Sequence, residues 1–297
     1  GGEGQVVILC GEAGIGKSRI VRNLRDQLVS EGCETIQFQC SPYHTNTALY
    51  PAITYLRQAA GLTEQDSPTM QLQKLDALAV RRGIDDQTTV ALLADLLSIH
   101  GDFRHQLLNA SSEKRKEMTL ETLVQQLHRL ADRCPTLFIV EDAHWLDPTT
   151  MDLLTRIIDR IHPMRVLLTI TFRPDFKPVW GDSGHVTFLT LSRLPRRHSV
   201  ELLASMTGGK ALPPEVQQAI LAKTDGIPLY LEELTKSLLE SGLLAEAKDS
   251  FSLKGPIKEL SIPDSLQALL MERIDRLGPA KEIVQTGAAI GREFGYE

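Results

Sequence analysis

The chain has 297 residues, 42% of them hydrophobic and 24% charged, so it can form one large α/β domain with a smaller companion and is too apolar to be disordered. Its formal net charge of −6 lacks the clustered cations of a nucleic-acid surface, so we do not expect nucleic acid to be a main partner of this chain. Four cysteines without a CxxC pair favour reduced thiols and a cytoplasmic location. No apolar run approaches the roughly 20 residues that cross a bilayer, so we expect no membrane insertion.

The first part of the chain predicts a strand, a loop and a helix. Residues 5–10 form a short apolar, β-branched run, a glycine-rich loop follows, and residues 17–30 carry apolar side chains at helical spacing. Residues 33–40 predict a second strand. Residues 49–132 then predict an insertion of several helices, with breaks near Gly61, Ser67-Pro68, Gly83 and residues 101–102.

Three further strands are expected after this insertion. Residues 136–140 are continuously apolar, as in a parallel strand covered on both faces, and they lead into Glu141 and Asp142. Asp147 and Pro148 suit an N-cap and the first position of a helix that runs to about residue 160. Strands are predicted over residues 166–172 and 186–191. Strands that alternate with helices predict a doubly wound, mostly parallel α/β sheet whose ligand lies at the carboxyl edge of the strands.

From about residue 195 onward the pattern is only helical. One helix is expected to end at residues 208–209, and two more are expected over residues 214–223 and 228–239. We therefore predict an α/β core over residues 1–192, a helical domain over 193–245, and a linker with a further segment over 246–297. Both ends of the sequence have the character of cuts within a longer polypeptide.

One loop carries a specific motif for phosphate binding. Residues 11–18 fit the pattern GxxxxGK[ST] directly after a strand and before a helix, which is the context that confirms the motif. Glycine turns point backbone N–H groups at phosphate oxygens, Lys17 is expected to reach the β- and γ-phosphates, and the Ser18 hydroxyl is expected to bind Mg²⁺. The loop consists of Gly11, Glu12, Ala13, Gly14, Ile15, Gly16, Lys17 and Ser18.

Glu141 and Asp142 are candidate catalytic acids. Carboxylates at the end of an apolar strand are costly to bury unless they face a cation or a reacting water. One of the two would hold the magnesium shell, for which we choose Glu141, and the other would polarise the attacking water.

Arg173 follows the strand at 166–172, so it emerges at the same edge and could read the γ-phosphate; a surface turn with an ion pair to Asp175 is the alternative. Near the two acids, His144 could orient a carboxylate or cap the turn, Trp145 suits packing, and Asp147 suits an N-cap better than a catalytic acid.

With these residues in view, the chain resembles the STAND class of P-loop ATPases, related to AAA+ proteins. The likeness is to the ATPase region found beside bacterial adenylate and guanylate cyclase domains and in large LuxR-type regulators. It rests on three blocks: GEAGIGKSR, LFIVEDAHWLDPTT and TDGIPLYLEELTKSLLESG.

The resemblance implies an ASCE/AAA-like fold that binds ATP or ADP with Mg²⁺. Residues 11–18 with Arg19 look like the Walker A loop, Glu141 and Asp142 like the Walker B acids, and Arg173 like the sensor arginine. Gly226 and Pro228 resemble a GxP element, in which Pro228 would help to enclose the adenine. Residues 262–296 are similar to the start of a winged-helix domain, which is expected to be truncated here.

Two departures from the family pattern matter. The usual order of the acids is Asp and then a second acid, whereas Glu141 comes first here, so the metal-side and water-side assignments stay open and we expect slow hydrolysis. The segment that precedes the P-loop strand in this class and touches adenine is not seen before Gly1, so isolated affinity is expected to suffer.

The sequence thus predicts an ATP- and magnesium-binding, slowly hydrolysing switch that acts on attached output domains, for nucleotide cyclisation or for transcription. Nucleotide-dependent self-association stays open. Two alternatives are a P-loop small-molecule kinase and a DNA-binding regulator that works through the C-terminal winged helix.

Overall fold

The computed structural model of the chain describes residues 2–84, 86–101, 110–181, 184–254, 265–275 and 277–290. It divides into two compact units. The first consists of Gly1–Glu12 and Lys17–Leu191, and the second of Ala13–Gly16 and Ser192–Glu297.

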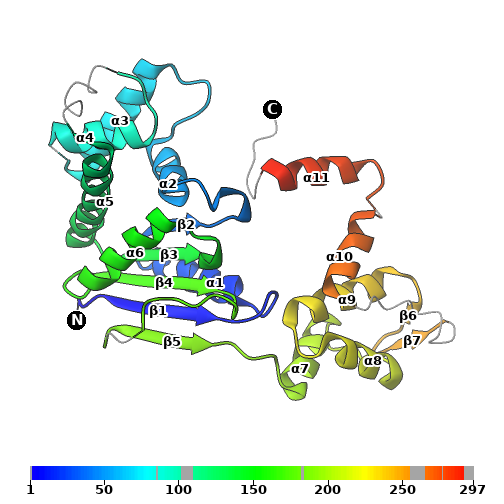
Figure 1. The fold of residues 1–297 in the computed structure, drawn as a ribbon. Coiled ribbons are helices and arrows are strands. Elements are labelled where there is room, and N and C mark those ends of the chain that lie inside the picture. Colours follow the sequence, from blue (N-terminus) through cyan, green and yellow to red (C-terminus); the bar gives the residue numbers. More distant parts are fainter. Residues whose placement is uncertain are drawn as a thin grey trace. The chain divides into compact units, whose positions relative to one another are not determined.

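The first unit is built on a five-stranded sheet in the order β2-β3-β4-β1-β5, with every neighbouring pair parallel (Figure 1). Its strands are β1 (Gln5–Cys10), β2 (Glu34–Gln39), β3 (Thr136–Glu141), β4 (Val166–Phe172) and β5 (Val186–Thr190). The predicted α/β fold with a doubly wound parallel sheet is confirmed.

Both faces of the inner strand β3 are covered, which explains why its sequence is continuously apolar, whereas the edge strand β5 is mostly exposed. All six residues of β3 are buried. Phe138 and Val140 belong to a core cluster with the inner side of α6 (Pro148–Arg160), whereas Leu137 and Ile139 pack with Val21 of α1 (Lys17–Ser30). A strand between two helical layers exposes neither face to water, so an alternating pattern is absent.

The helical insertion has a core of its own, made by the apolar faces of its first three long helices. The long helices of the insertion are α2 (Tyr50–Ala60), α3 (Pro68–Arg82), α4 (Gln87–Leu96) and α5 (Ser112–Arg133). Elsewhere in the first unit, η1 (Pro42–His44) and η3 (Ala143–Trp145) are short 3-10 helices. The predicted breaks are confirmed at three points: Gly61 and Gly83 end helices with positive φ, and the Ser67 hydroxyl caps α3. The fourth break includes residue 102, which lies outside the described residues.

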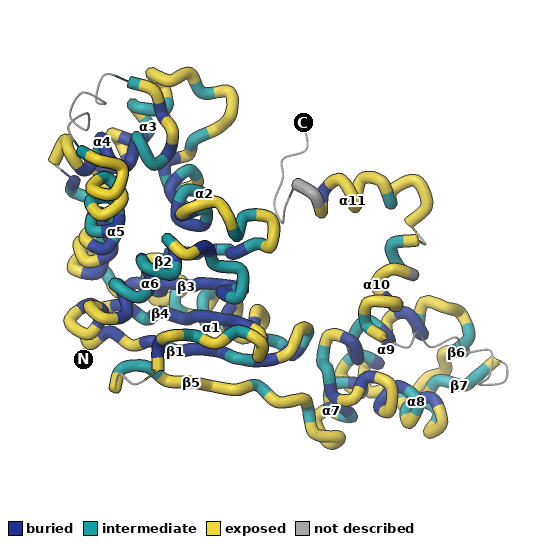
Figure 2. Tube along the Cα trace, in the orientation of Figure 1, coloured by how far each residue is buried: buried dark blue, intermediate teal, exposed yellow. Residues whose placement is uncertain are grey.

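The second unit is mostly helical, and Figure 2 shows buried positions along the facing sides of its helices. Its elements are α7 (Arg196–Met206), α8 (Pro214–Thr224), α9 (Pro228–Glu240), β6 (Leu244–Glu246), β7 (Phe251–Leu253), α10 (Leu266–Asp275) and α11 (Ala280–Ile290).

The antiparallel pair of β6 and β7 corrects the expectation of a purely helical pattern. Strands of three residues are too short to show a period of two, and their pairing depends on the turn in which Ala247 N donates to Ser250 O at 2.8 Å.

Helix α10 packs on α9. Leu269 is fully buried in the core of the second unit, and Arg273 forms an ion pair with Glu233 of α9. Part of the segment predicted to resemble a winged helix, residues 262–264, 276 and 291–296, lies outside the described residues.

Across all the residues that the structure describes, no helix combines the length and apolar character needed to cross a bilayer.

Candidate functional site

The loop of residues 11–18 leaves the carboxyl end of β1 and leads into α1, as the motif predicted. Gly11 N donates to Phe172 O at 3.3 Å, which joins the start of the loop to the end of β4. Gly14 and Gly16 have φ values of 76° and 109°, in the region that side chains disfavour. Ile15 is buried and anchors the loop. The side chains of Glu12, Ala13 and Ser18 are exposed, and Arg19, which follows the loop, is exposed as well.

Lys17 is the first residue of α1, and its ammonium group lies over the loop. Its Nζ donates to Gly11 O at 2.7 Å and to Glu12 O at 2.9 Å, and only 8% of the residue is exposed. Burial lowers the pKa of Lys17; the negative charge of Asp142 opposes this shift and the positive charge of Arg173 adds to it. The lysine therefore lies within the electrostatic reach of two predicted site residues.

The two acids have different surroundings. Glu141 is the last residue of β3, is buried, and accepts a hydrogen bond from Gln37 Nε2 at 2.9 Å. Asp142 is half-buried, and its Oδ2 accepts from Gln39 Nε2 at 3.4 Å. Glutamines of strand β2 thus contact both acids, and the charge of Asp142 acts on Lys17.

Asp142 has a left-handed backbone conformation, with φ 57° and ψ 43°. Such a conformation costs a non-glycine residue about 1–3 kcal/mol and often marks functional sites. Its N–H donates to Thr171 Oγ1 of β4 at 3.1 Å, and its carbonyl accepts from Trp145 N at 2.9 Å. These bonds turn the chain sharply after β3 and begin η3, which carries His144.

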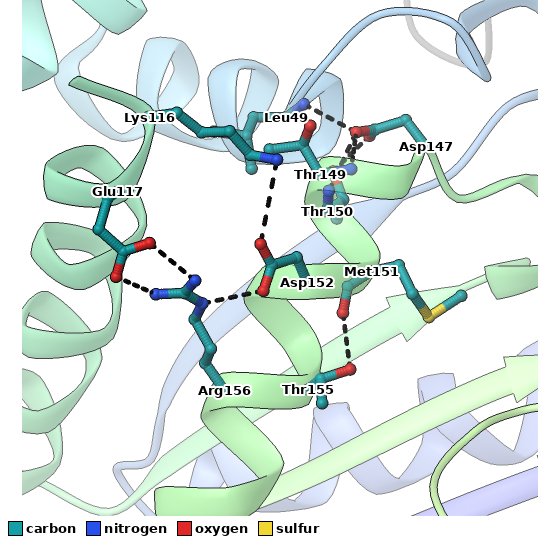
Figure 3. A network of polar contacts seen from close by, with 10 residues as sticks. All are labelled: Leu49, Lys116, Glu117, Asp147, Thr149, Thr150, Met151, Asp152, Thr155 and Arg156. Carbon is teal, nitrogen blue, oxygen red and sulfur yellow. Dashed lines mark hydrogen bonds and ion pairs between the residues drawn. The ribbon is translucent and has the colours of Figure 1, made fainter. Parts of the chain in front are cut away.

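Asp147 closes this turn and starts α6 (Figure 3). Its Oδ1 accepts from Thr149 N at 2.9 Å, from Thr150 N at 3.0 Å and from Leu49 N at 3.3 Å, and its Oδ2 accepts from the Thr150 hydroxyl. The predicted N-cap is confirmed. The bond to Leu49 also ties the start of the helical insertion to this turn.

Arg173 follows β4 and is exposed. Phe176 N donates to Arg173 O at 3.0 Å, so the predicted turn is present. No ion pair joins Arg173 to Asp175 in the part of the chain that the structure describes. The charge of Arg173 acts on Lys17 and on His144.

Neither predicted role of His144 is seen. Both of its ring nitrogens are buried and have no hydrogen-bond partner among the described residues, so it neither orients a carboxylate nor caps the turn by a hydrogen bond. Trp145 packs against the core cluster of the sheet and α6, as predicted.

The register of the sheet explains why these groups meet. Ile170 of β4 pairs with Ile8 of β1 and with Val140 of β3, so the residues that follow these three strands emerge at the same edge. Lys17, Asp142, Arg173 and His144 accordingly influence one another electrostatically.

Three supporting residues were missed from the sequence: Gln37, Gln39 and Thr171. The glutamines alternate with the apolar Ile36 and Phe38 in β2, and that alternation is the signal that could have drawn attention to them.

Gly226 and Pro228 belong to the second unit. Gly226 has φ 73°, Leu194 N donates to its carbonyl at 2.8 Å, and an added Cβ would lie 2.4 Å from Leu194 O. This close approach requires glycine. Pro228 is the first residue of α9, and in the same unit Leu229 N donates to Gly14 O at 3.1 Å.

A magnesium ion would need oxygen ligands from outside the chain. Among the described residues, no group of three or more His, Cys, Asp or Glu side chains could hold a metal ion. The exposed Ser18 hydroxyl fits a Mg²⁺ ion that keeps most of its water and phosphate ligands.

Comparison with known proteins shows which family and which proteins this chain is similar to. The model of a family described as "AAA ATPase domain" matches residues 1–170. An uncharacterized protein of Rhizobium meliloti (strain 1021) is 29% identical over 295 residues, which are 98% of this chain and 28% of that protein. This chain therefore spans little more than a quarter of the curated relative that it matches.

A solved structure is also similar: a Signal Transduction ATPase with Numerous Domains (STAND) protein with a tetratricopeptide repeat sensor, from Pyrococcus horikoshii. The match has 14% sequence identity and a TM-score of 0.45, and it covers 92% of this chain and 30% of that chain.

Proposed function

Since this chain belongs to the AAA ATPase domain family, we propose that it binds ATP with Mg²⁺ and hydrolyses it slowly, as a regulatory module of a larger signalling protein. One observation carries the proposal. The ammonium group of Lys17 lies over the glycine-rich loop, and its pKa responds to Asp142 and Arg173, which follow two other strands of the sheet.

The loop and the start of α1 bind the phosphates in this proposal. Backbone N–H groups of residues 11–18 and the positive end of α1 attract phosphate oxygens, and Lys17 exchanges its two carbonyl acceptors for the β- and γ-phosphates. Arg19, Gly226 and Pro228 complete the nucleotide contacts. Ser18 and Glu141 would hold the magnesium ion, which would supply positive charge that stabilises the phosphates.

Asp142 then polarises the attacking water, and Arg173 reads the γ-phosphate. The contacts support this division of roles between the two acids. Each acid accepts a hydrogen bond from a glutamine of β2, but Asp142 is the carboxylate whose charge acts on Lys17. Phosphoryl transfer demands mainly positioning and charge stabilisation from the protein, so small differences in carboxylate placement decide the rate.

We assign the module to the STAND class, as a switch whose ATP and ADP states bias attached output domains. Support for the class comes from the three sequence blocks, and the relative of which this chain covers 28% supports a place within a longer protein. The output is nucleotide cyclisation or transcription. The free thiol state of all four cysteines supports a cytoplasmic location.

The test combines Asp142→Asn with Glu141→Gln. Asp142→Asn is expected to keep ATP bound while phosphate release stops, whereas Glu141→Gln is expected to weaken the magnesium dependence of binding. Full turnover in Asp142→Asn would transfer the water-side role to Glu141. Phosphate transfer to an added small-molecule acceptor, in place of release to water, would show a kinase and contradict the proposal.

A further inference from the structure

His144 carries two buried hydrogen-bonding atoms that no described residue bonds. Nδ1 and Nε2 are both buried and lack partners among the described residues. A buried polar group without a hydrogen-bond partner is destabilising, so its presence needs a physical explanation. Its ring lies beside that of Trp145, with centroids 5.0 Å apart, which fixes the imidazole by packing alone.

The ring lies in the charge cluster of the proposed ATP site. The charges that act on His144 are those of Asp142, Arg173, Asp175 and Lys17. Its position is set by the left-handed turn at Asp142, which Thr171 holds through its hydroxyl group.

A neutral imidazole suits this place chemically. Burial is the largest influence on His144, and it lowers the pKa of the ring, which favours the neutral form. A neutral imidazole offers one N–H donor and one nitrogen acceptor. A glutamine amide offers the same pair, and glutamine is the residue that orients the attacking water in several P-loop GTPases.

We propose that His144 positions the attacking water: one ring nitrogen accepts a hydrogen bond from the water and the other donates to a γ-phosphoryl oxygen. This inference rests on the proposed function. The water has two protons, so Asp142 accepts one hydrogen bond and His144 the other. The water oxygen bonds to the γ-phosphorus, the bond to the β-γ bridging oxygen breaks with its electron pair leaving on ADP, and the water proton passes through Asp142 to solvent.

Two substitutions separate this role from packing. His144→Phe keeps a ring beside Trp145 but removes both nitrogens, and His144→Gln restores a donor and an acceptor. His162→Phe is the matched control, because His162 is exposed just beyond the far end of α6. For each variant, calorimetry measures the affinities for ADP and for a non-hydrolysable ATP analogue, and a phosphate-release assay measures kcat and KM.

We expect His144→Phe to weaken binding of the analogue roughly tenfold while ADP affinity is unchanged, as for the loss of one hydrogen bond to a charged group. Its kcat should fall on the order of 100-fold. His144→Gln should recover most of both effects, and His162→Phe should match the wild type.

If the ratio of the analogue affinity to the ADP affinity were the same in His144→Phe as in the wild type, the inference would be overturned. This holds even if wild-type hydrolysis is too slow to measure. Equal losses for ADP and the analogue, or a His144→Gln variant as impaired as His144→Phe, would reduce His144 to a packing residue. A wild-type protein that binds neither nucleotide would instead refute the proposed function.

Discussion

Replacing Asp147 with alanine removes a carboxylate that accepts hydrogen bonds from several donors. The expected loss of stability can be worked out from these contacts. Loss of an N-cap costs about 0.5–2 kcal/mol. The N–H of Leu49 also loses its partner in a buried position, which costs about 1–3 kcal/mol. We therefore expect a loss of about 2–4 kcal/mol in the free energy of unfolding of the first unit. Asp147→Asn keeps the Oδ1 acceptor and should lose far less.

Urea unfolding followed by tryptophan fluorescence measures this effect, because both tryptophans, Trp145 and Trp180, lie in the first unit. With a slope near 2 kcal/mol per molar urea, the midpoint for Asp147→Ala should fall by about 1–2 M. An unchanged midpoint would refute the capping argument. If Asp147→Asn folded as stably as the wild type but released no phosphate, Asp147 would be a catalytic acid rather than a cap.

Three further changes test other parts of the account. Gly226→Ala should destabilise the second unit by several kcal/mol, because φ is positive and the new Cβ would lie 2.4 Å from Leu194 O; circular dichroism should reveal a loss that tryptophan fluorescence does not follow. Arg156→Ala removes the salt bridge between Arg156 and Glu117 on a partly exposed surface. The free energy of unfolding should therefore change by no more than about 1 kcal/mol, and by less in high salt. A larger change would contradict the surface placement. Ser18→Ala should lower ATP affinity in magnesium to the value that the wild type shows with a chelator, whereas a retained magnesium dependence would exclude Ser18 as a ligand.

Local signals in the sequence predicted much of the fold. The motif at residues 11–18 is flanked by a strand and a helix, and the helix after Pro148 begins with a side-chain cap, so short-range chemistry sets both. The expectation that Glu141 and Arg173 follow neighbouring parallel strands came from a general rule on the carboxyl edge of such sheets. The pairing of β3 with β4 and of β4 with β1 agrees with it.

Other features depend on contacts between distant residues and could not be predicted. The bond from Gln37 to Glu141 joins residues 104 positions apart, and that from Asp142 to Thr171 joins residues 29 apart. The left-handed residue of the turn is Asp142 and not a glycine, so the sequence gives no signal for it. The burial of both His144 nitrogens depends on how that turn packs. A local pattern contains none of this information.

The central claim is that the loop and Lys17 together bind the triphosphate of ATP. Calorimetric titration of the wild type and of Lys17→Ala with ATP and magnesium tests it most directly, with circular dichroism to show that both are folded. The account predicts saturable binding to the wild type and none to a folded Lys17→Ala. Equal affinity in the two proteins would contradict it.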